Sequence, residues 1–214
     1  MRSDPAAPVT LGITGASGAP YAVRLLRVLN DSGTPVRLLL STYGWRLLAE
    51  EAGITNLDAL RAATGDWSQV TLYDAGDRGA TPASGSAPSR GMVVCPCSMG
   101  TLASIAAGVS RNLVERSADV TLKERRPLIL VPRETPLSLI HLENMVRLTR
   151  AGATILPAAP GFYHQPRSIE DLIDFVVARI LDHLGIEHAL GRRWRSGEQQ
   201  ADDLPDEAQR AVEE

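Results

Sequence analysis

Apolar runs alternate along this chain with segments whose apolar residues recur every three or four positions. The runs Val9 to Thr14 and Val36 to Leu40 have the pattern of buried strands. Between them, Ala19 to Asn30 has helical spacing, with Pro20 in its first turn and Gly33 just beyond its end. These positions predict a βαβ unit.

The alternation continues to the C-terminal third of the chain. Later strands are predicted from Met92, over Pro127 to Val131 and over Thr154 to Leu156. Helices are predicted over Trp45 to Ala52, Leu102 to Ala107, Leu113 to Leu122 and Ser138 to Arg150. A last helix is predicted to begin at a capping box over Ser168 to Asp171 and to run through Leu184. Strands that alternate with helices predict an α/β fold with a parallel sheet.

Two stretches lack this periodicity. Between Gly53 and Ser89 small and polar residues accumulate, most densely from Gly79 to Pro88, so we expect a mobile loop there. After Gly185 come the basic residues Arg192-Arg-Trp-Arg195 and an acidic, polar end. We therefore predict one domain over 9–190, a flexible N-terminus over 1–8 and a tail over 191–214. In that tail the Trp194 region would dock on the site or on a neighbouring subunit, and the remainder would be disordered.

Composition bounds the possible partners. A chain of 214 residues that is 44% hydrophobic suits one domain, and its net charge of -3 gives no bulk attraction to nucleic acid or to an anionic membrane. The start Met1 to Pro8 has no apolar core of the signal-peptide kind, so we expect a cytoplasmic protein. Cys95 and Cys97 stand too close together for a disulfide, and we predict two buried packing residues and no metal site.

Two strand-to-helix turns carry the strongest functional signal. Gly12-Ile-Thr-Gly-Ala-Ser-Gly-Ala-Pro-Tyr21 and Met92-Val-Val-Cys-Pro-Cys-Ser-Met-Gly-Thr101 each end an apolar run in a small, hydroxyl-rich turn. At the carboxyl ends of parallel strands, such turns direct backbone N–H groups and helix dipoles toward a phosphate. The structural alternative is that Gly15 and Gly18 only permit tight turns. Two such motifs in one chain favour a phosphorylated ligand.

The first turn does not fit every nucleotide. A dinucleotide fingerprint needs three glycines and an acidic residue after the next strand, where this chain has Ser41-Thr42. The Gly-Lys-Ser/Thr sequence of P-loop ATPases is also absent. Flavin mononucleotide (FMN) is therefore the leading ligand.

Four basic residues form a second group of candidates: Arg116, Lys123, Arg133 and Arg179. The alternative for any arginine is a solvated surface charge, which we expect for Arg125 and Arg126. Arg133 differs because it follows Leu-Ile-Leu-Val-Pro at the end of a predicted strand, where open α/β sheets bind ligands. Glu134 beside it could donate or accept a proton.

From Val9 to Trp194 the chain resembles the UbiX-type flavin prenyltransferases. The resemblance is carried by five segments in order: Gly12-Ile-Thr-Gly-Ala-Ser-Gly-Ala19, Cys95-Pro-Cys-Ser-Met-Gly-Thr-Leu102, Lys123-Glu-Arg-Arg-Pro-Leu-Ile-Leu-Val-Pro-Arg-Glu134, His141-Leu-Glu-Asn-Met145 and Pro157-Ala-Ala-Pro-Gly-Phe-Tyr-His164. It implies a three-layer Rossmann-like or flavodoxin-like subunit that assembles into a homododecamer. Reduced FMN and dimethylallyl monophosphate would bind where subunits meet.

The resemblance also implies a reaction that modifies the flavin. The dimethylallyl group would join the central-ring nitrogen with loss of phosphate, and a fourth ring would then close onto the neighbouring benzenoid carbon. The prenylated FMN would serve a UbiD-type decarboxylase. By the same resemblance FMN would be held by Gly15, Ala16, Ser17, Ser41, Ser98, Met99, Gly100, Thr101 and Arg133, and the prenyl phosphate by Lys123, Arg133, Tyr163 and Arg179.

Catalytic roles follow from the resemblance as hypotheses. Glu134 would pass a proton to phosphate, Ser17 and Glu51 would manage the proton on the flavin nitrogen, and Trp194 would offer a π face to a cationic carbon. Each role has a structural alternative. Trp194 and Tyr163 could be interface aromatics, and Glu51 could cap a helix end or exchange its role with Glu50.

Three other functions stay open. A cysteine-peptide decarboxylase shares the fold and FMN but uses an early histidine and a Pro-x-Met-Asn clamp, whereas no histidine precedes His141 here. An aromatic-acid decarboxylase lacks an obvious acid-base pair beyond Glu134. A non-catalytic FMN carrier would have no use for Lys123, Tyr163 and Arg179. The prenyl donor could be the monophosphate or the diphosphate, and the client decarboxylase stays unspecified.

Overall fold

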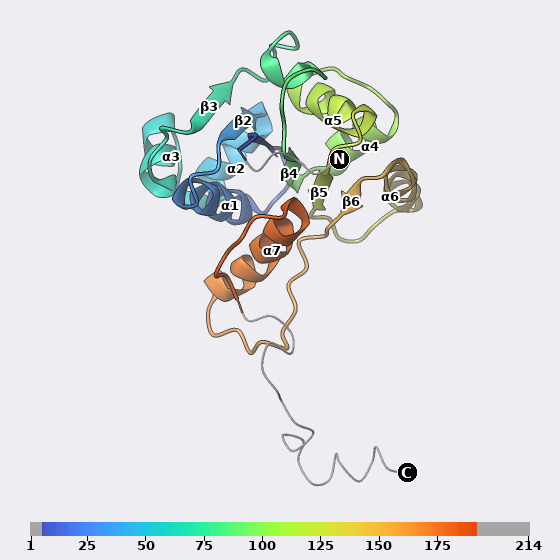
Figure 1. Ribbon diagram of the computed structural model, residues 1–214. Coiled ribbons are helices and arrows are strands. Elements are labelled where there is room, and N and C mark those ends of the chain that lie inside the picture. The colour runs from blue at the N-terminus through green and yellow to red at the C-terminus, as the bar shows by residue number, and fades with distance from the viewer. Residues whose placement is uncertain (1–5, 192–214) are drawn as a thin grey trace, which may run out of the picture.

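The computed structural model describes residues 6–191, and its centre is a parallel sheet of six strands (Figure 1). The strands are β1 (Val9–Ile13), β2 (Val36–Leu40), β3 (Val70–Tyr73), β4 (Gly91–Cys97), β5 (Leu128–Pro132) and β6 (Thr154–Ile155). Their order is β3-β2-β1-β4-β5-β6, and every neighbouring pair is parallel. This Rossmann-type order reverses direction between β1 and β4, where such sheets bind ligands.

Helices cover both faces of the sheet. They are α1 (Ala19–Asp31), α2 (Thr42–Ala52), α3 (Leu57–Thr64), α4 (Met99–Ala106), α5 (Leu113–Lys123), α6 (Leu139–Ala151) and α7 (Ile169–Leu184), with a short 3-10 turn, η1 (Thr81–Ala83). One apolar core joins α1, α2, α3 and α7 to one face, and a second core joins α4, α5 and α6 to the other. The prediction of a three-layer α/β fold is confirmed.

Alternation along the strands explains why two cores form. In β2, Leu38 and Leu40 belong to the core beneath α1, whereas Leu39 between them belongs to the core beneath α5. Side chains of a strand point alternately to its two faces, so a sheet covered on both sides needs apolar residues throughout. Each fully buried leucine contributes about 2 kcal/mol of apolar transfer.

The elements agree with the sequence pattern in most places and differ in three. The predicted βαβ unit over Val9 to Leu40 is present, and the capping box at Ser168 opens α7. The loop prediction from Gly53 to Ser89 was wrong in part, since α3 and β3 lie there. Helices α2 and α4 begin at Thr42 and Met99, three residues earlier than predicted, because Ser41 and Ser98 cap them.

The last helix is fastened to the first. Arg24 on α1 donates from Nε to Asp174 Oδ1 at 2.6 Å and from Nη2 to Oδ2 at 2.9 Å, a two-pronged pair with both side chains less than a quarter exposed. At the other end of α7, Arg90 donates to the carbonyl oxygens of Leu184 and Gly185. Charged hydrogen bonds of this kind contribute about 1.5–3 kcal/mol each. The Arg24–Asp174 pair fixes α7 against α1, and the bonds of Arg90 fix the end of α7 against the residue that precedes β4.

Cys95 and Cys97 are free, fully buried thiols on β4. Burial raises the pKa of both, that of Cys97 to about 12, so neither forms a thiolate at neutral pH. The prediction of packing residues is confirmed. Among residues 6–191, no helix is long and apolar enough to cross a bilayer.

Candidate active site

The two turns singled out in the sequence lie side by side and are joined through Thr14. The Thr14 hydroxyl donates to the carbonyl oxygen of Pro96 at 2.8 Å and accepts the backbone N–H of Ser98 at 2.9 Å. This side chain is buried, so its two bonds replace water completely. Thr14 therefore holds the carboxyl ends of β1 and β4 at a fixed separation, at the point where the strand order reverses.

The first turn runs from Gly15 to Gly18 and is pressed against α2. A Cβ atom at Gly15 would lie 2.4 Å from Cβ of Tyr43, a distance that real Cβ atoms do not show. Ser41 caps α2 by accepting the N–H of Gly44 at 3.0 Å. Position 15 therefore needs glycine because of close packing, although the residue itself is exposed.

Glu51 reaches the same turn from the far end of α2. Its Oε2 accepts the N–H groups of Gly18 and Ala19, both at 2.8 Å, and so caps helix α1. Burial raises the pKa of Glu51, but these two bonds, a bond from the Ser17 hydroxyl and the charge of Arg133 outweigh it and set the pKa below its ordinary value. The carboxylate is ionised at neutral pH.

Arg133 approaches this group from the end of β5. Its side chain donates from Nε to the carbonyl oxygen of Ser17 at 3.3 Å, while the residue itself is exposed. The structure thus brings together Ser17, Glu51 and Arg133, which are far apart in sequence. Glu134 follows on the exposed side and accepts the N–H of Thr135.

The second turn opens α4. Ser98 accepts the N–H of Thr101 at 3.2 Å, and its hydroxyl contacts that of Thr101 at 3.0 Å. Nothing stands within 4 Å of where a Cβ of Gly100 would be, so the first turn of α4 is open to a ligand. Backbone N–H groups at a helix start, with a guanidinium nearby, are a suitable site for a phosphate.

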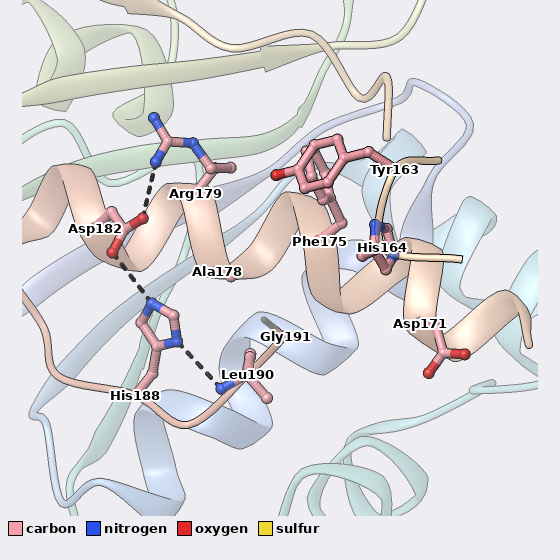
Figure 2. Close-up of a pocket in the computed structure, with 10 residues that line it drawn as sticks. All are labelled: Tyr163, His164, Asp171, Phe175, Ala178, Arg179, Asp182, His188, Leu190 and Gly191. Carbon is pink, nitrogen blue, oxygen red and sulfur yellow. Dashed lines mark hydrogen bonds and ion pairs between the residues drawn. The ribbon is translucent and has the colours of Figure 1, made fainter. Parts of the chain in front are cut away.

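A separate pocket of about 270 Å³ lies along α7 (Figure 2). It is lined by Tyr163, His164, Asp171, Phe175, Ala178, Arg179, Asp182, His188, Leu190 and Gly191. Tyr163 packs edge-on to Phe175 at a ring separation of 5.7 Å, and the Arg179 side chain is 53% exposed. Arg179 donates to Asp182 at 2.9 Å. Two predicted prenyl-phosphate residues therefore share one cavity.

The other basic candidates lie elsewhere. Lys123 ends α5, pairs with Glu124 and lies beside Gly85, so it does not line this pocket. Arg116 pairs with Asp119 on the same helix at 2.7 Å. Trp194 falls outside the described residues. Within one chain, the predicted phosphate residues are therefore divided between α5, the end of β5 and the α7 pocket.

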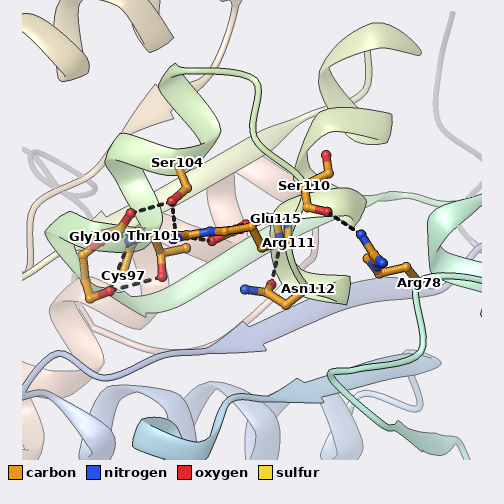
Figure 3. Close-up of polar contacts among 10 residues, drawn as sticks. Arg78, Cys97, Gly100, Thr101, Ser104, Ser110, Arg111, Asn112 and Glu115 are labelled. Carbon is orange, nitrogen blue, oxygen red and sulfur yellow. Dashed lines mark hydrogen bonds and ion pairs between the residues drawn. The ribbon is translucent and has the colours of Figure 1, made fainter.

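A polar network behind α4 was not foreseen (Figure 3). Arg111 donates to both carboxylate oxygens of buried Glu115 and to the Ser104 hydroxyl, which in turn donates to the carbonyl oxygen of Gly100. The network ties the start of α5 to the first turn of α4. The spacing of Arg111 and Glu115, four residues apart, is the signal in the sequence that could have revealed it.

The residues of the two turns fit the phosphate of FMN. The exposed Gly15, the uncovered start of α4 and the guanidinium of Arg133 offer donors and positive charge at one edge of the sheet, whereas the N–H groups of Gly18 and Ala19 are taken by Glu51. Among residues 6–191 no group of three or more potential metal ligands of the His, Cys, Asp or Glu type is present.

Comparison with known proteins decides the family. The family model described as Flavoprotein matches residues 1–181. The flavin prenyltransferase UbiX of Halalkalibacterium halodurans is 53% identical over 191 residues, which span 86% of this chain and 92% of the relative. UbiX of Pseudomonas aeruginosa is 51% identical over 199 residues, or 89% of this chain and 94% of that one. The chain belongs to the UbiX family of flavin prenyltransferases.

Solved structures of the UbiX family agree with the fold. The crystal structure of AnUbiX (PadA1), in complex with FMN and dimethylallyl pyrophosphate, has a TM-score of 0.81 and 40% identity, covering 90% of this chain and 99% of that one. The dodecameric FMN-dependent UbiX-like decarboxylase from Escherichia coli O157:H7 has a TM-score of 0.79 and 43% identity over 87% of this chain and 98% of that one. A PPC decarboxylase mutant, 20% identical with a TM-score of 0.55, shares the fold alone.

Proposed function

We propose that this UbiX-family protein transfers the dimethylallyl group of dimethylallyl monophosphate to reduced FMN. The carbon–oxygen bond to phosphate breaks, a carbon–nitrogen bond to the central ring forms, and one carbon–carbon bond then closes a ring onto the benzenoid carbon. The hydrogens on the ring nitrogen and on the benzenoid carbon leave as protons. The departing phosphate takes up one proton and the alkene carbon takes up one, so the protons balance. No external oxidant or reductant is required.

One observation supports this proposal: two separate groups of residues in the chain have N–H donors and positive charge that suit an anion. The turns after β1 and β4 with Arg133 form one, and Tyr163 with Arg179 in the α7 pocket forms the other. A protein that only stored FMN would need the first site alone. Two anion sites suit two phosphorylated substrates, and the FMN and dimethylallyl pyrophosphate of the AnUbiX complex support the same pairing.

Departure of phosphate without a metal requires fixed positive charge. In the proposal Lys123, Arg133 and Arg179 stabilise the phosphate, Tyr163 donates its hydroxyl, and Glu134 delivers a proton to it. In the same proposal, FMN is held by its polar groups, which contact Gly15, Ala16, Ser41 and the start of α4 from Ser98 to Thr101. Arg133 would face both substrates from the end of β5.

Ser17 and Glu51 are the groups proposed to hold the proton of the flavin nitrogen. Glu51 is ionised because its pKa is lowered, and its bond with the Ser17 hydroxyl links the two side chains. An ionised carboxylate behind a serine can accept a proton through the hydroxyl. Trp194 is proposed to face the cationic prenyl carbon.

We further propose that the two half-sites meet between copies of the chain. Helix α6 presents an apolar surface in which Leu139 is 70% and Ile140 68% exposed, continued by Leu142 and Val146. A patch of this kind on one helix marks an interface. The separation of Lys123 from the α7 pocket in one chain supports a site completed by a neighbour, and the dodecameric relative supports assembly of twelve copies.

The product would be prenylated FMN, and a UbiD-type decarboxylase would use it as its cofactor. A reducing, cytoplasmic location suits two free thiols at Cys95 and Cys97.

Anaerobic incubation with reduced FMN and dimethylallyl monophosphate, followed by mass spectrometry of the released flavin, tests the proposal. We expect a flavin heavier by one dimethylallyl unit. Unmodified flavin from protein that binds FMN, with the diphosphate donor also tried, would overturn it in favour of a carrier or a decarboxylase. Calorimetry with dimethylallyl monophosphate separates a transferase from a carrier, because a carrier has no affinity for the prenyl donor.

A further inference from the structure

The Arg179 side chain does not stand alone in the α7 pocket. Its Nη1 donates to Asp182 Oδ2 at 2.9 Å, one turn further along the helix. The other oxygen of the same carboxylate, Oδ1, contacts Nε2 of His188 at 3.3 Å. Figure 2 shows the three side chains as one row, Arg179, Asp182 and His188.

The direction of the bond from His188 is set by its other nitrogen. The backbone N–H of Leu190 donates to His188 Nδ1 at 3.2 Å, so Nδ1 is an acceptor. The hydrogen of the neutral ring is then on Nε2 and points at Asp182. The His188 side chain is 4% exposed, and this arrangement is shielded from water.

Proteins use hydrogen-bonded rows of this kind to orient a functional side chain. A carboxylate between a histidine and a guanidinium is held at both oxygens, and it holds the guanidinium in one direction in return. Arg179 carries five N–H donors, of which this bond uses one, and its side chain is 53% exposed. The remaining donors can meet an anion in the pocket without rearrangement.

We infer that His188 is a positioning residue for the prenyl donor, acting through Asp182 to fix the guanidinium of Arg179 at the α7 pocket. The inference rests on the proposed prenyl transfer and deepens it. A freely rotating arginine loses side-chain entropy when it binds phosphate, whereas one already oriented loses little. The row therefore favours binding of the donor and leaves FMN binding unaffected.

A pair of substitutions separates the two bonds of His188. The amide nitrogen of His188→Gln reaches about where Nε2 stands and keeps a donor toward Asp182. The amide oxygen of His188→Asn stands near Nδ1 and keeps the acceptor for Leu190. His183→Asn, an exposed histidine on the last turn of the same helix, is the matched control.

The experiment measures KM for dimethylallyl monophosphate, kcat and the dissociation constant for FMN. We expect His188→Asn to raise KM for the donor about tenfold with FMN affinity unchanged, the size of one lost hydrogen bond to a charge. For His188→Gln and His183→Asn we expect a KM for the donor within about twofold of the wild-type value. Equal effects of the two His188 variants, or a loss of FMN affinity, would overturn the inference, because both point to a structural role.

Asp182→Asn provides a second route if a His188 variant folds poorly. We expect it to raise KM for the donor to a similar extent and to show no further rise when combined with His188→Asn, since both act through one bond. Additive effects would contradict the inference. If wild-type protein yields no modified flavin, the proposed function fails. Calorimetry of dimethylallyl monophosphate binding to the FMN-loaded variants then tests the inference by itself: weaker binding to His188→Asn than to wild type supports it, and a wild type without affinity for the donor overturns it.

Discussion

The carboxylate of Glu51 accepts the backbone N–H of Gly18 at 2.8 Å, across 33 positions of sequence. Gly18 has no side chain with which to cap α1, and the carboxylate of Glu51 on α2 caps the helix instead. The turn that is proposed to hold FMN is therefore closed by a residue that is also the proposed base. Folding of the turn and ionisation of the carboxylate are linked at this point.

The first prediction concerns this carboxylate. Glu51→Gln removes the charge that complements the start of α1, and we expect a loss of about 1 kcal/mol in the free energy of unfolding. We also expect at least a tenfold slower formation of prenylated flavin, because a neutral amide cannot accept the proton. Urea unfolding and single-turnover assays with mass detection measure the two effects.

The matched control is the neighbouring carboxylate. Glu50 pairs with Arg46 on the exposed side of α2, and exposed pairs of this kind contribute less than about 1 kcal/mol. Glu50→Gln should leave the rate of prenylation unchanged. A normal rate for Glu51→Gln together with a slow one for Glu50→Gln would show that the wrong carboxylate was assigned.

This cap also shows where sequence reasoning stops. The turn over Gly15 to Gly18 and the position of Arg133 at a strand end could be predicted, because both follow from strand periodicity and the rule for ligand sites in open sheets. The bonds from Gly18 and Ala19 to Glu51 depend on how α2 packs. No local pattern encodes that packing angle.

Short elements limited the prediction of the fold. Helix α3 has eight residues, and β3 is an edge strand of four residues without a buried one, so neither produces a clear periodic signal. The row that leads from Arg179 to His188 was missed for another reason. The spacing of Arg179 and Asp182 on one helix is visible in the sequence, but the return of His188 to Asp182 requires the turn at Gly185.

The second prediction tests the packing of the first turn. Gly15→Ala places a methyl group against Tyr43 of α2, and the turn or the helix must move. Overpacking of this kind costs about 1–3 kcal/mol, so we expect FMN affinity to fall by about tenfold. Flavin fluorescence titration measures it. Gly79→Ala, whose Cβ would stand 3.4 Å from its nearest neighbour, is the control and should bind normally; equal affinities would refute close packing at Gly15.

The third prediction concerns pH. Burial raises the pKa of Glu115, but the hydrogen bonds and the positive charge of Arg111 outweigh it and leave the pKa below its ordinary value of 4.5. A lowered acid pKa contributes stability above the unfolded-state pKa and loses it as the pH falls through the folded-state value. We expect stability to be level near neutrality and to decline below about pH 5.

Glu115→Gln removes part of that decline. At pH 7 we expect a loss of about 2 kcal/mol, because a nearly buried charge-assisted network is broken. In acid, the free energies of unfolding of the variant and the wild type should become similar. Urea unfolding at several pH values measures both. An acid dependence that Glu115→Gln leaves unchanged would exclude Glu115 as a source of it.

The fourth prediction concerns assembly. Ile140→Glu places a charge in the exposed apolar surface of α6, and we expect the assembly to dissociate into smaller species that retain the circular dichroism of the folded chain. Light scattering after size exclusion measures the mass. Val109→Glu, at a half-exposed residue after α4, is the control. An unchanged mass for Ile140→Glu would remove α6 from the interface.

The most direct test of the proposed reaction is its stoichiometry. Protein, reduced FMN and dimethylallyl monophosphate are mixed without oxygen and with a metal chelator, and both inorganic phosphate and prenylated flavin are counted. The account predicts one phosphate released for each flavin modified, at a rate that the chelator does not change. Phosphate released without modified flavin would contradict it.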